Sequence, residues 1–143
     1  MKPTAPDRSA FRLFRPIATR WADNDIYGHV NNVEYYAFFD TAVNGHLIDA
    51  GALSIGDGHV IGLVVSTSCD YFSPVAFPDA LEAGLGVTRL GTSSVTYRVG
   101  IFKLGDETAS AAGSFTHVYV GSSARRPVPL PETYLKALEP LKI

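Results

Sequence analysis

Two carboxylates, a histidine and a glycine are concentrated in one short segment near the start of the chain. Residues 23–32 read Asp-Asn-Asp-Ile-Tyr-Gly-His-Val-Asn-Asn. A carboxylate such as Asp25 could act as a nucleophile or as the base that activates water, and His29 has an imidazole that titrates near neutral pH. Any chemistry is therefore expected in this segment, although Asp25 could also serve only to shape an Asx turn.

A long helix is predicted directly after this segment. Apolar residues recur at spacings of three and four between residues 33 and 50, and Gly51 follows as a left-handed C-cap. Asn31 is a good N-cap, and Glu34 completes a capping-box spacing, so the helix should begin at about Asn32. Its apolar face is wide, which predicts a helix that lies deep in the protein.

Alternating and β-branched patterns predict strands over most of the remaining chain. The expected strands lie at residues 11–21, 59–71, 80–90, 95–102 and 112–120. Pro16 places the first strand at a sheet edge or at a bulge. Turns near residues 91–93 and 105–107 join the last three strands into an antiparallel meander, and a short helix is expected at residues 132–138. The predicted fold class is α+β, with a curved five-stranded antiparallel sheet around one long helix.

Size and charge bound the possible functions. The 143 residues, 46% of them hydrophobic, fit a single domain at 1–143, with an N-terminal tail at 1–10 and a C-terminal connection and short helix at 122–143. Twelve Lys and Arg against fourteen Asp and Glu provide no basic field for nucleic acid or an anionic membrane. Cys69 stands alone, so no intrachain disulfide is possible. No secretory signal or membrane span is evident, and we expect a cytoplasmic protein.

The loop also partly matches a calcium-binding EF-hand. Asp23, Asp25, Gly28 and Glu34 fit four of the required positions, but Tyr27 stands where an oxygen ligand belongs. The preceding segment is strand-like, whereas an EF-hand needs a helix there. The histidines are scattered without zinc spacing. We therefore expect no metal and no cofactor.

The chain resembles the hot-dog-fold acyl-CoA thioesterases of the 4-hydroxybenzoyl-CoA thioesterase type. The resemblance extends from Arg12 to about Tyr134 and is most specific at residues 21–35, which are similar to the family's pattern of Asp, turn, Gly-His-Val-Asn-Asn and Tyr. Weaker similarity lies at residues 70–75, 90–95 and 126–131. The resemblance implies a hot-dog fold and hydrolysis of an acyl-CoA to the free acid and CoA.

The resemblance also implies roles for individual residues. The family's catalytic carboxylate matches Asp25, and first-turn helix amides at Asn32 and Val33 could donate to the oxyanion that develops on the thioester carbonyl. His29 could position the substrate or simply hold the turn. In relatives, CoA contacts come from a hairpin and from basic residues late in the chain. The hairpin residues here are Arg89, Gly91, Thr92 and Ser93, and the late basic residues are Arg125 and Arg126.

Two alternatives share this fold and stay open. One is a non-catalytic acyl-CoA-binding module, and the other is a thioesterase that acts on acyl carrier protein. The sequence leaves the acyl group undetermined. Hot-dog domains usually place their active sites at a dimer interface, and many dimers pair again, so the resemblance implies a homodimer or homotetramer with an acyl-CoA as its small-molecule partner.

Overall fold

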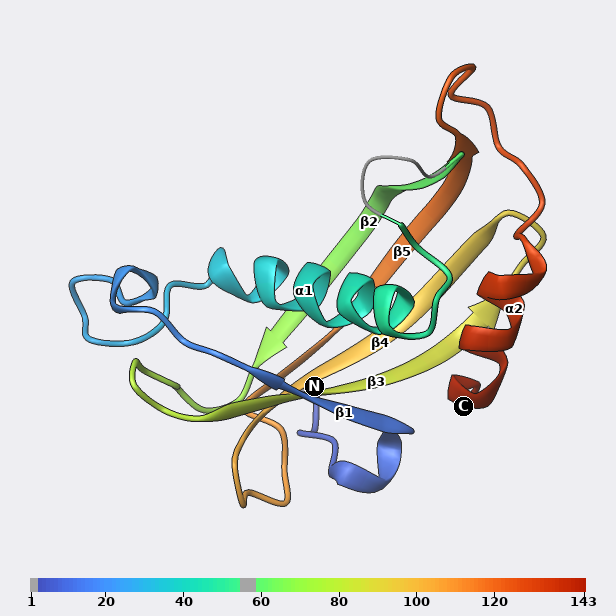
Figure 1. Cartoon of the computed structure of the whole chain (residues 1–143). Coiled ribbons are helices and arrows are strands. Elements are labelled where there is room, and N and C mark those ends of the chain that lie inside the picture. The colour runs from blue at the N-terminus through green and yellow to red at the C-terminus, as the bar shows by residue number, and fades with distance from the viewer. Residues whose placement is uncertain (1–2, 55–58) are drawn as a thin grey trace.

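One antiparallel sheet and one long helix make up most of the molecule. The computed structural model describes residues 3–54 and 59–143. Its elements are β1 (Leu13–Ile17), α1 (Glu34–Asp49), β2 (Val60–Tyr71), β3 (Leu81–Leu90), β4 (Ser94–Lys103), β5 (Ala111–Gly121) and α2 (Glu132–Leu138). The sheet order is β1-β3-β4-β5-β2, and α1 lies across one face of the sheet (Figure 1). This arrangement confirms the predicted α+β class and hot-dog fold.

The two faces of the sheet differ in character because side chains alternate along each strand. On β4, Val95, Tyr97, Val99 and Ile101 are at most 1% exposed and belong to the core that also contains the buried face of α1. The intervening residues point to the outer face, away from α1. The predicted meander of β3, β4 and β5 is confirmed by their antiparallel registers.

The first strand is shorter than predicted. It ends at Ile17, and Trp21 lies instead in a short 3-10 helix, Trp21–Asp23. The strand cannot continue to Trp21 because the Asp23 carboxylate accepts a hydrogen bond from the Arg20 amide and closes a turn. The edge position expected from Pro16 is confirmed, since β1 pairs with β3 alone among the strands that the structure describes.

The predicted capping box at the start of α1 is wrong. The helix begins at Glu34 rather than near Asn32, and the Asn31 side chain accepts only a 3.3 Å bond from the Val33 amide. The Glu34 carboxylate turns instead to the Arg20 guanidinium, 3.3 Å away. At the other end the prediction is confirmed, because Gly51 has φ +76° and donates to the Ile48 carbonyl at 3.0 Å.

One face of α1 is covered by the described residues 3–54 and 59–143. Its buried residues are Tyr35, Phe38, Phe39, Ala42, Val43 and Leu47, while Ile48 on another face is 40% exposed. The expectation of a deeply enclosed helix is therefore wrong for a single chain, because the sheet curves around one side and leaves the other open (Figure 1). Among the described residues, no helix is long and apolar enough to cross a membrane.

Candidate active site

A buried carboxylate organises the loop that leads into α1. Asp23 is 1% exposed, and its two oxygens accept from the Arg20 amide at 2.7 Å and the Arg20 Nε at 2.9 Å. The Asp23 carbonyl accepts from the Asn31 amide at 2.8 Å, which joins the two ends of the loop. Arg20 also contacts Glu34, so one cation neutralises both ends of the segment that resembles a calcium loop.

Asp25 both shapes the loop and retains a free oxygen. Its Oδ1 accepts from the Tyr27 amide at 2.9 Å, which forms the Asx turn, and its carbonyl accepts from Gly28, whose φ is +85°. Its amide donates to the His29 carbonyl at 2.9 Å. The second carboxylate oxygen makes no hydrogen bond or ion pair with the residues that the structure describes, so the structural role leaves it available for chemistry.

A mostly apolar cavity of about 300 Å³ opens beside this loop. His29, Asn32, Tyr35, Tyr71 and residues 72–74 line it. The Tyr71 hydroxyl donates to the Asn32 carbonyl at 3.2 Å, and the Tyr35 and Tyr71 rings pack edge to face with centroids 5.0 Å apart. Burial raises the pKa of Tyr35 to about 12 and that of Tyr71 still further, so both phenols stay protonated at neutral pH. The walls suit an acyl group.

The structure brings only part of the predicted catalytic set to this cavity. His29 and Asn32 line it, whereas Asp25 and Val33 do not. The Val33 amide already donates to the Asn31 side chain, and its side chain is 58% exposed. The Asn32 amide has no hydrogen-bond partner in the described part of the chain, which makes it the better placed of the two candidate oxyanion donors.

The predicted CoA-contacting residues lie elsewhere. The β3–β4 hairpin, which carries Gly91, Thr92 and Ser93, sits near α2, at the end of the sheet away from the Asp25 loop (Figure 1). Backbone hydrogen bonds from these three residues close the hairpin and tie it to β5 and to the segment before α2. Arg89 is exposed at the end of β3. A single chain therefore does not bring this hairpin to Asp25.

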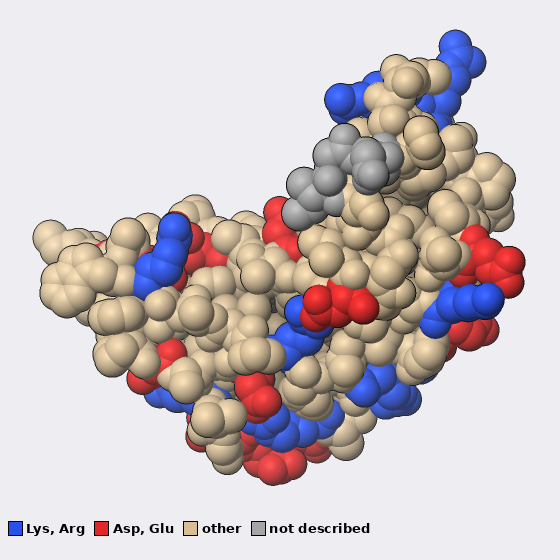
Figure 2. All heavy atoms as spheres, in the orientation of Figure 1, with Lys and Arg blue, Asp and Glu red and all other residues tan. Residues whose placement is uncertain are grey.

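Basic side chains also project from the segment that follows β5. This segment protrudes from the body of the molecule and carries Lys or Arg atoms at its tip (Figure 2). Arg125 and Arg126 lie in it and are both exposed. Over the rest of the visible face, acidic and basic side chains are interspersed. These two arginines remain candidates for contacts with CoA phosphates.

The sequence of residues 19–138 matches the Thioesterase-like superfamily. The chain belongs to this superfamily. The match includes the Asp25 loop, α1 and all strands except β1. The narrower assignment to the 4-hydroxybenzoyl-CoA thioesterase type stays a prediction.

Several known proteins are similar to this superfamily member. The PA5185 protein from Pseudomonas aeruginosa strain PAO1 is 57% identical, with 97% of each chain covered and a TM-score of 0.95. Slr0204, a 1,4-dihydroxy-2-naphthoyl-CoA thioesterase from Synechocystis, shares the fold at 22% identity and a TM-score of 0.78, covering 87% of this chain and 93% of that one. Uncharacterized protein YsmA of Bacillus subtilis (strain 168) is 25% identical over 89 residues, which are 62% of this chain and 60% of YsmA.

One part of the superfamily member's cavity was not predicted. Tyr71 holds the carbonyl of Asn32, and residues 72–74 complete the wall. The sequence contains a signal for this wall, since Pro74 follows soon after the β-rich run and ends it. The packing of the end of β2 against the start of α1 is a long-range contact, which local patterns do not predict.

Proposed function

We propose that this protein hydrolyses the thioester of an acyl-CoA to the free acid and CoA, with Asp25 as the acting carboxylate. Superfamily membership supports thioester hydrolysis as the general reaction. The shared fold of a 1,4-dihydroxy-2-naphthoyl-CoA thioesterase supports CoA as the thiol. The observation that carries the proposal is the unpaired oxygen of Asp25, in a loop whose other residues, His29 and Asn32, line an apolar cavity.

The chemistry requires little more than a carboxylate and an oxyanion donor. Asp25 attacks the thioester carbonyl carbon, or removes a proton from the water that attacks it, and the carbonyl electron pair moves to oxygen. The Asn32 amide stabilises that oxyanion, which then collapses and breaks the carbon–sulfur bond. CoA leaves as a thiolate, so no strong acid is needed. If Asp25 is the nucleophile, water hydrolyses the resulting anhydride and restores the carboxylate.

We propose further that the complete site needs a second copy of the chain. The Asp25 loop exposes four large apolar side chains: Trp21 (83%), Ile26 (94%), Tyr27 (83%) and Val33 (58%). Such a cluster on a small protein is typical of an interface. The edge strand β2 is also exposed along most of its length, with Val65 58% exposed. A long apolar edge strand favours pairing with another chain.

An antiparallel pairing of β2 with the β2 of a second copy explains how the separated groups meet. A two-fold axis places the Tyr71 end of one strand beside the Val60 end of the other. The Asp25 loop lies toward the first end, and the protruding segment after β5 lies toward the second (Figure 1). The dimer therefore brings the loop of one copy toward the predicted CoA-contacting end of the other.

Val65→Lys tests this pairing. A charge on the edge strand should convert the protein to a monomer in analytical ultracentrifugation and abolish turnover. Leu104→Lys is the matched control, because Leu104 is 65% exposed in the turn after β4 and should leave both properties unchanged. A Val65→Lys variant that remains dimeric with full turnover would contradict the β2 interface. A homotetramer would appear as a second association step of the wild type.

Asp25→Asn tests the reaction itself. Asparagine keeps the side-chain oxygen that accepts from Tyr27, so the loop should fold, but it lacks the nucleophilic or basic carboxylate. We expect thiol release, followed with a disulfide-exchange dye, to fall by about 10²–10⁴-fold with an unchanged melting temperature. Asp106→Asn, in the exposed β4–β5 turn, is the matched control.

The substrate panel should contain short, long and aromatic acyl-CoAs and acyl carrier protein thioesters. Full turnover by Asp25→Asn would refute the assignment of the carboxylate. Tight binding of acyl-CoA by the wild type without any product would favour the non-catalytic binding module. Turnover only of carrier-protein thioesters would replace CoA as the thiol and leave the role of Asp25 in place.

A further inference from the structure

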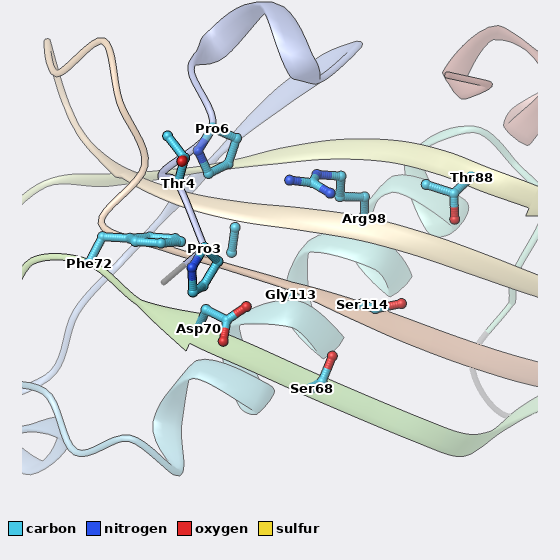
Figure 3. A pocket seen from close by; sticks show the side chains of 11 residues that line it. Pro3, Thr4, Pro6, Ser68, Asp70, Phe72, Thr88, Arg98, Gly113 and Ser114 are labelled. Atoms are coloured by element: carbon cyan, nitrogen blue, oxygen red, sulfur yellow. The ribbon is translucent and has the colours of Figure 1, made fainter. Parts of the chain in front are cut away.

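A second cavity lies on the outer face of the sheet, away from α1. It has a volume of about 250 Å³. Ser68 and Asp70 of β2, Arg98 of β4 and Ser114 of β5 contribute polar side chains to it (Figure 3). Residues 3–6 of the N-terminal segment pass over it, and the Ala109 amide anchors that segment through a 2.9 Å bond to the Pro6 carbonyl.

The strand registers explain how these groups come to share one cavity. Arg98 lies opposite Ser114, and Ser114 lies opposite Ser68, so the three form a row across β4, β5 and β2. In the adjacent row Asp70 lies opposite Ala112, whose methyl group leaves space above the sheet. Because β5 separates Asp70 from Arg98, their charged ends stay more than an ion-pair distance apart.

The Arg98 guanidinium has no partner among the described residues. Its Nε is buried without a hydrogen bond, and none of its donors bonds to any residue within 3–54 or 59–143. The Phe11 ring, with its centroid 5.9 Å from the Arg98 Cζ, supports the group from one side. Arg98 as a whole is only partly buried and lines the cavity, so its unpaired guanidinium is available to an anionic ligand. Its planar fork matches a carboxylate.

We propose that this cavity binds a small carboxylic acid that carries its own hydroxyl or ammonium donor, such as an α-hydroxy or α-amino acid. Arg98 binds the carboxylate, and the hydroxyls of Ser68 and Ser114 donate to it as well. Asp70 accepts from the ligand's hydroxyl or ammonium group, and its charge opposes a dianion such as phosphate. The cavity volume of about 250 Å³ accommodates a ligand of this size.

The site is independent of the proposed thioesterase reaction. Its floor side chains lie on the outer face of the sheet, whereas the cavity beside the Asp25 loop lies at the start of α1. A failure to bind small acids would therefore leave the assignment of Asp25 untouched. Equally, Asp25→Asn should lose thiol release but bind small acids at Arg98 as the wild type does.

Titration calorimetry of the full chain with four probes tests the proposal. The probes are lactate, alanine, propionate and inorganic phosphate, of which only the first two combine a single carboxylate with a donor. We expect lactate or alanine to bind with a lower Kd than propionate or phosphate. Arg98→Gln should weaken that binding by about 10- to 100-fold, as expected for the loss of charge-assisted hydrogen bonds. Arg12→Gln, which changes an exposed arginine outside the cavity, should bind normally.

Asp70→Ala gives an independent arm if Arg98→Gln does not fold. The Asp70 side chain lies on the outer face of β2 and not in the backbone edge proposed for the dimer, so Asp70→Ala should fold and associate as the wild type does, and it should abolish the preference for lactate or alanine over propionate. Absence of saturable binding of lactate and alanine to the wild type would overturn the proposal. So would phosphate binding as tightly as lactate, an unchanged Kd in Arg98→Gln, or a preference that survives in Asp70→Ala.

Discussion

His117 should couple the stability of the fold to pH. The residue lies on the inner face of β5 and is 2% exposed, between the rings of Phe115 and Tyr97. Its Nδ1 lies 3.3 Å from the Tyr119 hydroxyl, and its Nε2 is buried without a partner in the described part of the molecule. Burial lowers the pKa of His117 from 6.5 to about 4, because the imidazolium would lose its hydration.

The sign and size of the effect follow from this lowered pKa. Below about pH 6.5 the unfolded chain binds a proton at this position, whereas the folded chain does not until the pH approaches 4. Acidification therefore stabilises the unfolded state across this window. The contribution of His117 to the free energy of unfolding should fall by about 2 kcal/mol between pH 7 and pH 5, and by about 3 kcal/mol by pH 4.

Urea unfolding followed by far-UV circular dichroism at pH 7, 6 and 5 measures this loss. Protein concentration must be constant, because association adds to the apparent stability. His117→Gln should show about 2 kcal/mol less pH dependence than the wild type over this range. His59→Gln changes an exposed histidine and should retain the wild-type dependence. Equal pH dependence in His117→Gln and the wild type would refute the reasoning.

Two further variants test the core. Tyr119→Phe removes the hydroxyl that lies 2.7 Å from the buried Tyr97 hydroxyl, and it should lower the free energy of unfolding by about 1–3 kcal/mol. Tyr27→Phe, at an exposed position, is the control and should change the free energy of unfolding little. Equal effects of the two variants would contradict the role of the buried pair. Gly113→Ala places a Cβ against the backbone carbonyl of Ser68, and it should lower the free energy of unfolding, measured in urea, by about 1–3 kcal/mol. An unchanged free energy of unfolding would show that β2 and β5 separate easily.

Local patterns predicted most elements of the fold. Side-chain alternation and turn residues located β3, β4 and β5, and the short helix after Pro131 has the expected bounds, Glu132–Leu138. The errors lie where a distant residue competes for a local partner. Glu34 fits a capping box by spacing, but Arg20 lies beside it in the folded chain and takes its carboxylate. Sequence spacing gives no measure of that competition.

Some residues of the candidate site could be predicted from the sequence, and others could not. The family resemblance pointed to Asp25 and Asn32, and the structure adds which of their atoms are unpaired. The cavity at Arg98 was not predicted, because it depends on the register of three strands and on the path of the N-terminal segment. One signal was present, since Arg98 is the single charged residue in the alternating run at residues 95–102.

The position of the Asp25 loop supports the proposal that the thioesterase site is completed by a second chain. Within one chain, the carboxylate is outside the cavity that His29 and Asn32 line, and its neighbours Ile26 and Tyr27 are almost fully exposed. Asp25 is only partly buried, and a carboxylate and an oxyanion donor are both more effective where water is excluded. A second chain packed over this loop would exclude water from Asp25 and cover the apolar side chains at the same time. Association and catalysis should therefore be lost together in Val65→Lys, whereas Asp25→Asn should lose catalysis alone.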